Sequence, residues 1–276
     1  MSATRTLYAA QTGTIGGTAF AVQSASCETS IPIEDLTVFG RLGSAGRFQK
    51  DVATCKADVK VYAFAGMGKM VSGLIVDATA GTTTIIKVAP NGFTMSGILS
   101  SFSVDSAKGD FVTASFSFAG VGEAKHDSAA NPGVAKTQFA SVTPYLSSDV
   151  TVSDTCPSSM KFSLDIPNEV VSCLGGAITG GQVFVSTDNI MFSKPPFKSS
   201  LTIEGLAVNV AGGISTLKIG NDVDGASPPV KVGTDCVSID IVDGETISKS
   251  FNQSAGDLGA TFSYNVEGTD LAITNS

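Results

Sequence analysis

The sequence has no tryptophan, a single histidine and few charged residues, which make up 15% of its 276 residues. The histidine, His126, stands beside Asp127 in a polar stretch, and no serine or cysteine nucleophile motif surrounds it. A catalytic triad needs a histidine held in a formed cleft, so hydrolysis through His126 is not predicted. We predict no catalytic, cofactor-binding or metal-binding residues for this chain.

Long hydrophobic runs are also missing. No window approaches the roughly 18 apolar residues that a membrane helix requires. The first ten residues, MSATRTLYAA, contain no apolar segment typical of a secretory signal. We therefore expect a protein that is made in the cytoplasm, without a membrane partner, and that stays soluble or assembles there.

Cysteine usage argues against disulfides and metal centres. The five cysteines are odd in number and widely spaced, with no C-x-x-C pair, so most are expected to be small buried hydrophobic residues; they are Cys27, Cys55, Cys156, Cys173 and Cys236. The net charge of −8 disfavours a basic groove for nucleic acid, because phosphate binding needs clustered lysine and arginine.

Two glycine-rich segments resemble ligand-binding loops only in part. Gly66-Met67-Gly68-Lys69 lacks the spacing and the following serine or threonine of a phosphate loop, so we interpret it as a hairpin tip. Asp222, Asp224 and Gly225 resemble part of a calcium loop. The closing glutamate is replaced by Lys231, whose charge would repel the cation, so an ordinary turn is predicted.

Alternation of apolar and polar residues dominates what is present. It predicts half-buried strands of an all-β protein, centred on Val112–Phe118, Leu201–Ile203, Val237–Ile241 and Phe262–Val266. Phe116, Phe118, Phe262 and Tyr264 are predicted to anchor the core or an interface. Turn signals such as Lys108-Gly109-Asp110 separate the runs at short intervals, which favours an antiparallel sandwich or barrel over a βαβ fold.

An internal repeat organises the chain. Ser24–Gly40, SASCETSIPIEDLTVFG, aligns without a gap with Ser159–Gly175, SMKFSLDIPNEVVSCLG. Further along, Val59 matches Ile203, and Ala114–Phe118 matches Ala260–Tyr264. Because the three blocks keep their order, they predict a duplication. We also expect strand Asp58–Phe64 to correspond to Ser200–Leu206.

The duplication predicts two domains, residues 1–130 and 131–276, joined by a polar linker at His126–Val134. Each copy is expected to contain one short helix, beginning near Pro32 or Pro167 and ending at Gly40 or Gly175, with a structured loop as the alternative. Glu34 and Glu169 then occupy equivalent places in separate domains. Helix-end electrostatics or a subunit contact explains them better than paired catalytic carboxylates.

The segment Phe93–Gly122, FTMSGILSSFSVDSAKGDFVTASFSFAGVG, resembles the last hairpin of tail tube proteins of long-tailed bacteriophages. In that family, a strand with a G-x-(I/V)-x-x-(F/L) pattern leads through a Gly/Asp turn to a strand of alternating aromatic and small polar residues. Here the match is carried by Gly97, Ile98, Phe102, Gly109, Asp110, Phe116, Phe118 and Gly120.

The resemblance implies a fold of two tandem β-sandwich domains, each with a short flanking helix, and a structural role without enzymatic activity. Three chains with two tube domains each would form a pseudo-sixfold ring, and rings would stack into a tube in the virion. The partners implied are further copies of the chain and other tail proteins, with DNA only as cargo in the lumen. Glycine-rich loops such as Gly66–Gly73 and Ala211–Gly213 are expected to order on assembly and are the candidates for the axial contact between rings.

Other functions stay open from the residues alone, because a fold does not determine a function. A capsid decoration protein or a tail terminator-like component would also suit a duplicated sandwich. A secreted binding module or pilin is disfavoured by the missing signal segment. A hydrolase that uses carboxylates is disfavoured because no set of suitably spaced carboxylates stands out.

Overall fold

The computed structural model describes most of the chain up to Asp127 and separate strands beyond it. The described residues are 12–37, 39–40, 43–63, 67–89, 92–127, 150–152, 156–166, 170–172, 177–179, 182–184, 190–192, 198–206, 216–219, 237–242, 245–252, 261–268 and 270–275. Within them the chain is mostly β, with one helix. The all-β class predicted from the sequence is confirmed.

The described part of the first half contains nine strands and the helix. In chain order these are β1 Thr12–Ile15, β2 Thr18–Ser30, β3 Ile33–Thr37, β4 Ser44–Gln49, β5 Thr54–Tyr62, α1 Met67–Ala80, β6 Thr84–Ala89, β7 Gly92–Ala107, β8 Thr113–Val121 and β9 Lys125–Asp127.

The described part of the second half is built from strands. They are β10 Val150–Val152, β11 Cys156–Asp165, β12 Val170–Ser172, β13 Ala177–Thr179, β14 Gln182–Phe184, β15 Ile190–Phe192, β16 Lys198–Leu206, β17 Thr216–Ile219, β18 Val237–Val242, β19 Glu245–Asn252, β20 Thr261–Gly268 and β21 Asp270–Asn275.

Six strands of the first half close into a cycle. β1 pairs with β2, β2 with β5, β5 with β8, β8 with β7, β7 with β6, and β6 with β1, all antiparallel. The 16-residue β7 makes closure possible, because its first part pairs with β6 and its later part with β8. A closed cycle satisfies the backbone hydrogen bonds that an open sheet leaves unpaired.

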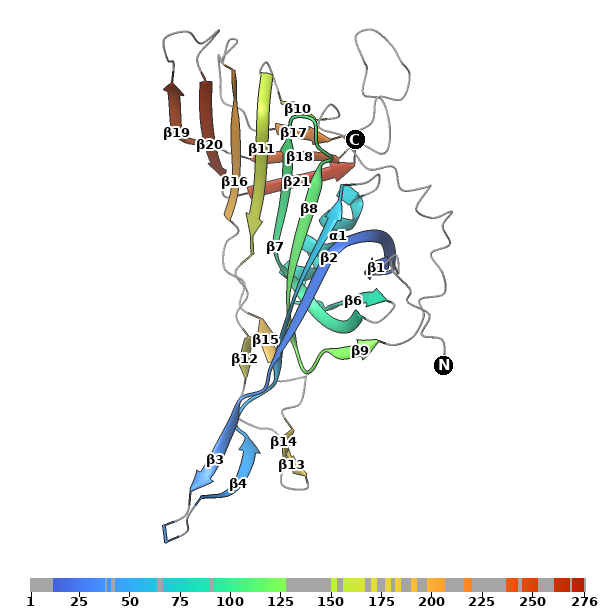
Figure 1. Ribbon diagram of the computed structural model, residues 1–276, viewed down its shortest axis with the longest axis vertical. Coiled ribbons are helices and arrows are strands. Elements are labelled where there is room, and N and C mark those ends of the chain that lie inside the picture. Colours follow the sequence, from blue (N-terminus) through green and yellow to red (C-terminus); the bar gives the residue numbers. More distant parts are fainter. Residues whose placement is uncertain are drawn as a thin grey trace, which may run out of the picture.

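The later part of β7 also joins the two halves. Its second edge pairs with β11, from Ser101↔Asp165 to Ala107↔Ser159. The sheet then continues through β16 and β20 to β19. Figure 1 shows the result as a row of long strands, with β19 at one end and β2 toward the other. We call the eight strands β19-β20-β16-β11-β7-β8-β5-β2 the long row.

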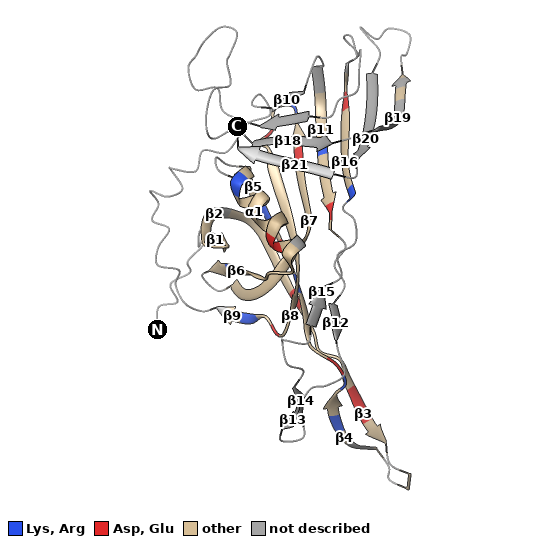
Figure 2. Ribbon diagram, turned by 180° about the vertical axis from the view of Figure 1, so that it is seen from behind, with Lys and Arg blue, Asp and Glu red and all other residues tan. Residues whose placement is uncertain are grey.

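One face of the long row is covered by other elements. A four-stranded sheet, β10-β17-β18-β21, lies across it, and its strands run transverse to the long strands in Figures 1 and 2. Helix α1 contacts β7 and also β21, so it lies next to both halves of the chain. No helix of the described residues is long and apolar enough to cross a membrane.

The core lies on this covered face. Val112, Ala114, Phe116 and Phe118 are buried, whereas the residues between them are partly exposed, so the predicted alternation is confirmed. Phe102 packs against Phe116 at 5.1 Å between ring centroids, and against Phe162 of β11 at 6.1 Å. The aromatic core therefore runs through the β7–β11 junction. The side chains of Phe262 and Tyr264 lie outside the described part of the structure.

The predicted hairpin of Phe93–Gly122 is present as β7 and β8. Its turn contains Gly109 at φ +90°, and the amide of Asp110 donates a hydrogen bond to the carbonyl oxygen of Ala107 at 3.1 Å. A side chain at position 109 would be strained, because L-residues rarely adopt a positive φ.

The predicted helix near Pro32 is wrong. Residues Ile33–Thr37 form strand β3, which pairs with β4 in a hairpin. A helix there would have placed Asp35 in the middle of its apolar face, whereas the hairpin lets Asp35 bind Arg47 across the strands. In the second half, Val170–Ser172 is likewise a strand, paired with β15. The alternative, a structured loop, is equally incorrect for these residues.

The predicted hairpin tip at Gly66–Lys69 is also wrong, because α1 begins at Met67. The buried side chains of this helix follow a helical spacing that the glycines at 66, 68 and 73 conceal: they are Met67, Met70, Val71, Leu74 and Ala78. The segment Gly66–Gly73 therefore lies largely in a formed helix, and its role as a loop that orders on assembly is not supported. Ala211–Gly213 lies outside the described residues.

The predicted linker begins too early. His126 and Asp127 belong to β9, where His126 pairs with Phe93 of β7. The rest of His126–Val134 lies outside the described residues. Because β7 of the first half pairs with β11 of the second, the two halves share one continuous sheet and are not separated by a linker at this point.

The strand pairings of the first half recur in the second. β2-β5-β8-β7 corresponds to β11-β16-β20-β19, because each neighbouring pair in the first set has a counterpart in the second. A β-bulge between Val22 and Ser24 has its counterpart between Pro157 and Ser159. A second bulge, between Leu99 and Ser101, has its counterpart between Thr246 and Ser248.

The bulges also set the alignment of the strands. Counted from the first bulge, Val59 corresponds to Ile203, as one sequence match predicts. Val59 pairs with Phe116 and Ile203 with Tyr264, so Phe116 corresponds to Tyr264 and not to Phe262. The expected superpositions of Asp58 on Ser200 and of Phe116 on Phe262 are therefore each displaced by two residues. Such a displacement keeps every side chain on its face, so alternation cannot reveal it.

Candidate functional site

The opposite face of the long row, which we call the uncovered face because no described element lies across it, is polar. Side chains of β5, β7, β8, β11 and β16 that do not enter the core point here, and many are serine or threonine. Among the described residues, and with Glu28 of β2, which is opposite Lys56, its charged side chains are four lysines and five carboxylates: Lys56, Lys60, Lys161, Lys198, Glu28, Asp58, Asp105, Asp165 and Glu204. Since carboxylates slightly outnumber lysines, this face has no net attraction for a polyanion such as DNA.

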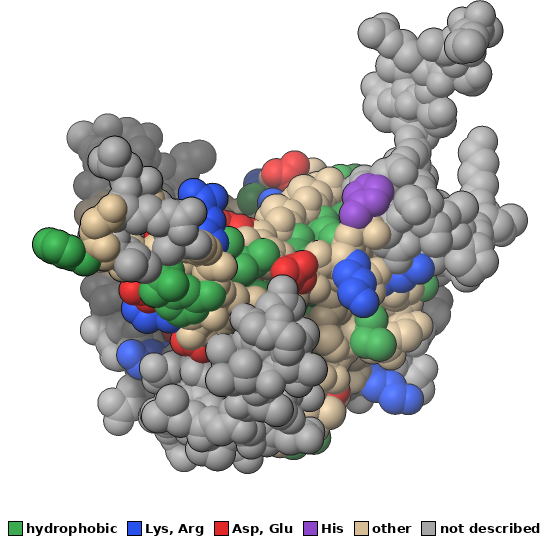
Figure 3. Space-filling view, turned by 90° about the horizontal axis from the view of Figure 1, so that it is seen from below, with side chains coloured by type: hydrophobic (Ala, Val, Ile, Leu, Met, Phe, Trp, Pro, Cys, Tyr) green, Lys and Arg blue, Asp and Glu red, His purple; other side chains and the backbone are tan. Residues whose placement is uncertain are grey.

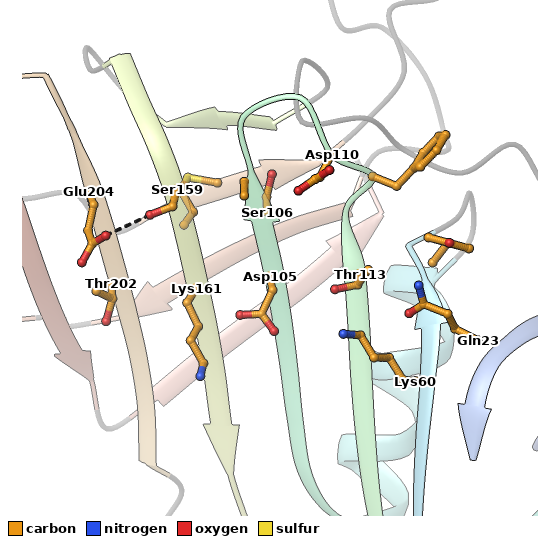
Figure 4. Close-up of a pocket in the computed structure, with 14 residues that line it drawn as sticks. Gln23, Lys60, Asp105, Ser106, Asp110, Thr113, Ser159, Lys161, Thr202 and Glu204 are labelled. Carbon is orange, nitrogen blue, oxygen red and sulfur yellow. Dashed lines mark hydrogen bonds between the residues drawn. The ribbon is translucent and has the colours of Figure 1, made fainter.

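An open groove of about 600 Å³ lies on this face, over the β7–β11 junction. Figure 4 shows Lys60, Asp105, Lys161 and Glu204 along it, on β5, β7, β11 and β16. Asp105 and Lys161 are directly opposite each other in the β7–β11 ladder. Opposite charges in that position stabilise a pair of strands, so these residues support the junction of the two halves.

The groove shows no catalytic arrangement. Its lining residues include neither histidine nor cysteine, and the interaction drawn in Figure 4 is a hydrogen bond of 3.2 Å from the Ser159 hydroxyl to Glu204. In the described part of the chain, no three histidine, cysteine, aspartate or glutamate residues gather as a metal site would require. His126 is exposed on β9, away from the lining residues of the groove.

Two cysteines, Cys27 and Cys55, are neighbours in the closed cycle of strands. Cys55 is buried and Cys27 partly buried, as predicted, and neither forms a disulfide. Burial, and secondarily the neighbouring Cys27, raises the pKa of the Cys55 thiol to about 11. Burial also raises the pKa of Cys27, whose sulfur lies 3.8 Å from that of Met95. Protonated thiols are poor nucleophiles, so both act as core residues. The side chains of Cys156, Cys173 and Cys236 lie outside the described residues.

The β3–β4 hairpin, which we call the arm, projects from the body of the molecule (Figure 1). Every residue of β3 is exposed. Two ion pairs hold the arm together, Arg47 to Asp35 at 2.8 Å and Lys50 to Glu34 at 3.1 Å. Glu34 thus serves a strand pair, so the predicted helix-end role is wrong for it. Glu169 lies outside the described residues.

The arm carries most of the large apolar side chains that are exposed in the described part of the chain. Those on the arm or at its base are Ile31, Ile33, Leu36, Phe39 and Phe48. Leu36 and Phe48 share one face, since Leu36 is opposite Gly46 and Phe48 opposite Glu34. Figure 3, which views the molecule from the arm end, shows hydrophobic side chains exposed there. Exposed apolar side chains gathered in one place are typical of surfaces that bind other molecules, so the arm is a candidate contact surface.

The sequence motifs did not reveal this surface. The proline and glycine boundaries of the arm predict a short helix, and Ile33–Thr37 has no apolar–polar alternation that would have indicated a strand. Comparison of the sequence with models of known protein families gives no match, and comparison with curated protein sequences gives none either.

Proposed function

We propose that this chain is a structural subunit that assembles into rings, and that the rings stack into a tube of the bacteriophage tail type. The observation that carries the proposal is the junction inside the chain. Two four-stranded units with the same strand pairings and the same bulges meet edge to edge through β7 and β11. A unit that joins its neighbour in this way within the chain has a surface that can be used again between chains.

We interpret the halves, residues 1–130 and 131–276, as tandem tube domains of the β-sandwich type that arose by duplication. Support comes from two further strand pairs that recur. The pair β1–β6 of the first half corresponds to β10–β17 of the second, and the pair β7–β9 corresponds to β18–β21. Three chains would then present six similar units, and a threefold ring is the expected assembly. It would reside in the virion after synthesis in the host cytoplasm.

The two faces of the long row suit different roles in such a ring. The covered face carries the small sheet and α1, and it would face outward. The uncovered face is rich in hydroxyl groups and carries no excess of positive charge, so DNA could pass along it without being held. On this interpretation DNA is cargo and not a bound ligand.

The arm suits the axial contact. Its exposed apolar side chains include Leu36 at 51% and Phe39 at 107% relative exposure, so they contact little of their own chain. We place the arm against a copy in the next ring, where burial of these side chains would stabilise the stack. The arm thus takes the role that the sequence assigned to the loop Gly66–Gly73. Other tail proteins would bind at the two ends of the tube.

The test is assembly of the purified protein. Light scattering at several concentrations is expected to show a species of about 84 kDa, three times 28.0 kDa. Negative-stain microscopy of concentrated protein is expected to show rings and stacked rings. A decoration protein would instead stay a small oligomer until it met a capsid. Protein that stays monomeric at every concentration, even with tail-tip components added as nuclei, would exclude the proposed function.

A further inference from the structure

The two ends of the long row are a matched pair of strand edges. Over Val22–Ser30, β2 pairs with β5 alone, and β19 pairs with β20 alone, among the strands that the structure describes. In the pairing correspondence, β2 is the counterpart of β11 and β19 is the counterpart of the later part of β7. These counterparts, β11 and β7, are the two strands that pair with each other inside the chain.

We propose that β19 of one copy pairs antiparallel with β2 of the next copy, in the register of the β7–β11 junction. This inference rests on the proposed function, since it specifies the lateral contact of the ring. The occupant of each edge is therefore a second copy of this chain. The chain already shows the contact once, between strands with the same neighbours and the same bulges.

The register follows from the bulges. The second bulge makes Ser101 the counterpart of Ser248, so Ser103 corresponds to Ser250. The first bulge makes Ser159 the counterpart of Ser24, so Ser163 corresponds to Glu28. Ser103 and Ser163 are directly opposite each other in the junction. In the contact between copies, Ser250 is therefore opposite Glu28 of the neighbour.

The proposed pair is suited to a chemical test. Glu28 and Ser250 are both exposed in the isolated chain, so they can be replaced without disturbing the core. Residues directly opposite in an antiparallel ladder have β-carbons about 4.5–5.5 Å apart. Cysteines at such positions come close to the geometry that a disulfide requires. A disulfide between chains would thus report both the strand partners and their register.

The contact also completes the sheet. Pairing β19 with β2 removes the two open edges of the long row, which otherwise invite uncontrolled association. Each contact is heterologous, because the two edges differ. Such contacts either close into a ring or continue as a helix, depending on the rotation between copies. Since all strands in the long row are already paired in the chain, no refolding is needed before assembly.

The experiment is cross-linking of the assembled full-length chain under mild oxidation. The double variant Glu28→Cys/Ser250→Cys is expected to form disulfides between chains, with dimer and trimer bands on non-reducing gels that vanish on reduction. Ser103→Cys/Ser163→Cys is the matched internal pair and is expected to form a disulfide within one chain. Ser26→Cys/Ser250→Cys is displaced by two residues on one strand and is expected to cross-link much less. The wild type and the single variants report the background from native cysteines.

The outcomes separate the two proposals. Chains that assemble into rings but give no more Glu28→Cys/Ser250→Cys cross-linking than the displaced pair would overturn the contact and leave the proposed function intact. Failure of the internal pair to cross-link would also overturn the contact, because its register is taken from that junction. A chain that never assembles would overturn the proposed function, and the contact with it.

Discussion

At the residue scale, Gly120 lies where β8 closely approaches its neighbours. A β-carbon built at Gly120 would meet the backbone carbonyl oxygen of Ser96 and would lie 2.9 Å from the sulfur of Cys55. Gly97, directly opposite in the ladder, is similarly crowded by the backbone of Ala119. Both glycines thus have a physical role, since a side chain at either position would prevent β7 and β8 from approaching this closely.

Gly120→Ala is therefore expected to destabilise the protein by about 1–3 kcal/mol through overpacking. Gly73→Ala is the matched control. Gly73 lies exposed in α1 with open space around it, so alanine is expected to stabilise the helix by about 1 kcal/mol. Chemical denaturation followed by circular dichroism measures both. Equal effects of the two substitutions would contradict the crowding at Gly120.

The Cys55 thiol links stability to alkaline pH. Its pKa rises from 9.0 to about 11 on folding, so the folded state favours the protonated thiol. The stabilisation is fully present below pH 9 and is lost as the pH rises toward 11, at about 1.4 kcal/mol per pH unit within that window. Cys55→Ala removes the ionising group and is expected to show a shallower decline over pH 9–11. Identical pH profiles for the two proteins in denaturant titrations would contradict this coupling.

At the element scale, residues 33–37 of the arm form a strand because a second strand, β4, is available to pair with them. Residues 33–37 carry a proline before them and a glycine after them, as a short helix does. The segment Ser44–Gln49 supplies a strand partner, and the two ion pairs add cross-strand support. A five-residue stretch has too few turns to be stable as a helix alone, so the hairpin prevails.

Leu36→Ser/Phe48→Ser tests the function proposed for the arm. Both side chains are exposed, so the free energy of unfolding is expected to change by less than about 0.5 kcal/mol for each. Stacking is expected to be lost while single rings remain, because the apolar contact between rings is removed. Ile85→Ser, which alters an exposed apolar residue on β6, is the control and should stack normally. Electron microscopy and sedimentation measure the outcome, and normal stacking of the double variant would exclude this role.

At the scale of the whole molecule, the closed cycle gives the first half a complete sheet of its own. All six strands of the cycle and α1 come from residues 12–121. A fragment of residues 1–128 is therefore expected to fold, with the β-rich circular dichroism and cooperative unfolding of a domain. It would lose Phe162 from the aromatic core and uncover the β7 edge, so lower stability and a tendency to associate are expected.

Adding Ser103→Lys to the fragment places a charge on the uncovered edge strand and is expected to reduce that association. Size-exclusion chromatography compares the two fragments. An unfolded fragment, as judged by circular dichroism, would show that the first half depends on the second for its fold.

The local features of the fold followed from the sequence itself. Period-two alternation determined which side chains of β8 enter the core, because successive residues of a strand point to opposite faces. Phe116 and Phe118 are buried for this reason. The β7–β8 turn followed from Gly109, which can adopt the positive φ it requires. Each of these features depends on a few neighbouring residues, so a single sequence contains the information.

The tertiary structure decided what depends on distant partners. The sequence did not show that β7 pairs with both β8 and β11, that residues 33–37 form an arm, or that the glycine-containing segment 67–80 forms helix α1. Strands pair through backbone groups, so the side-chain pattern of a strand does not identify its partner. A shift of two residues keeps every side chain on the same face, so alternation does not determine the exact register either. The β7–β11 junction, from which the proposed contact between copies derives, arises only when both halves have folded.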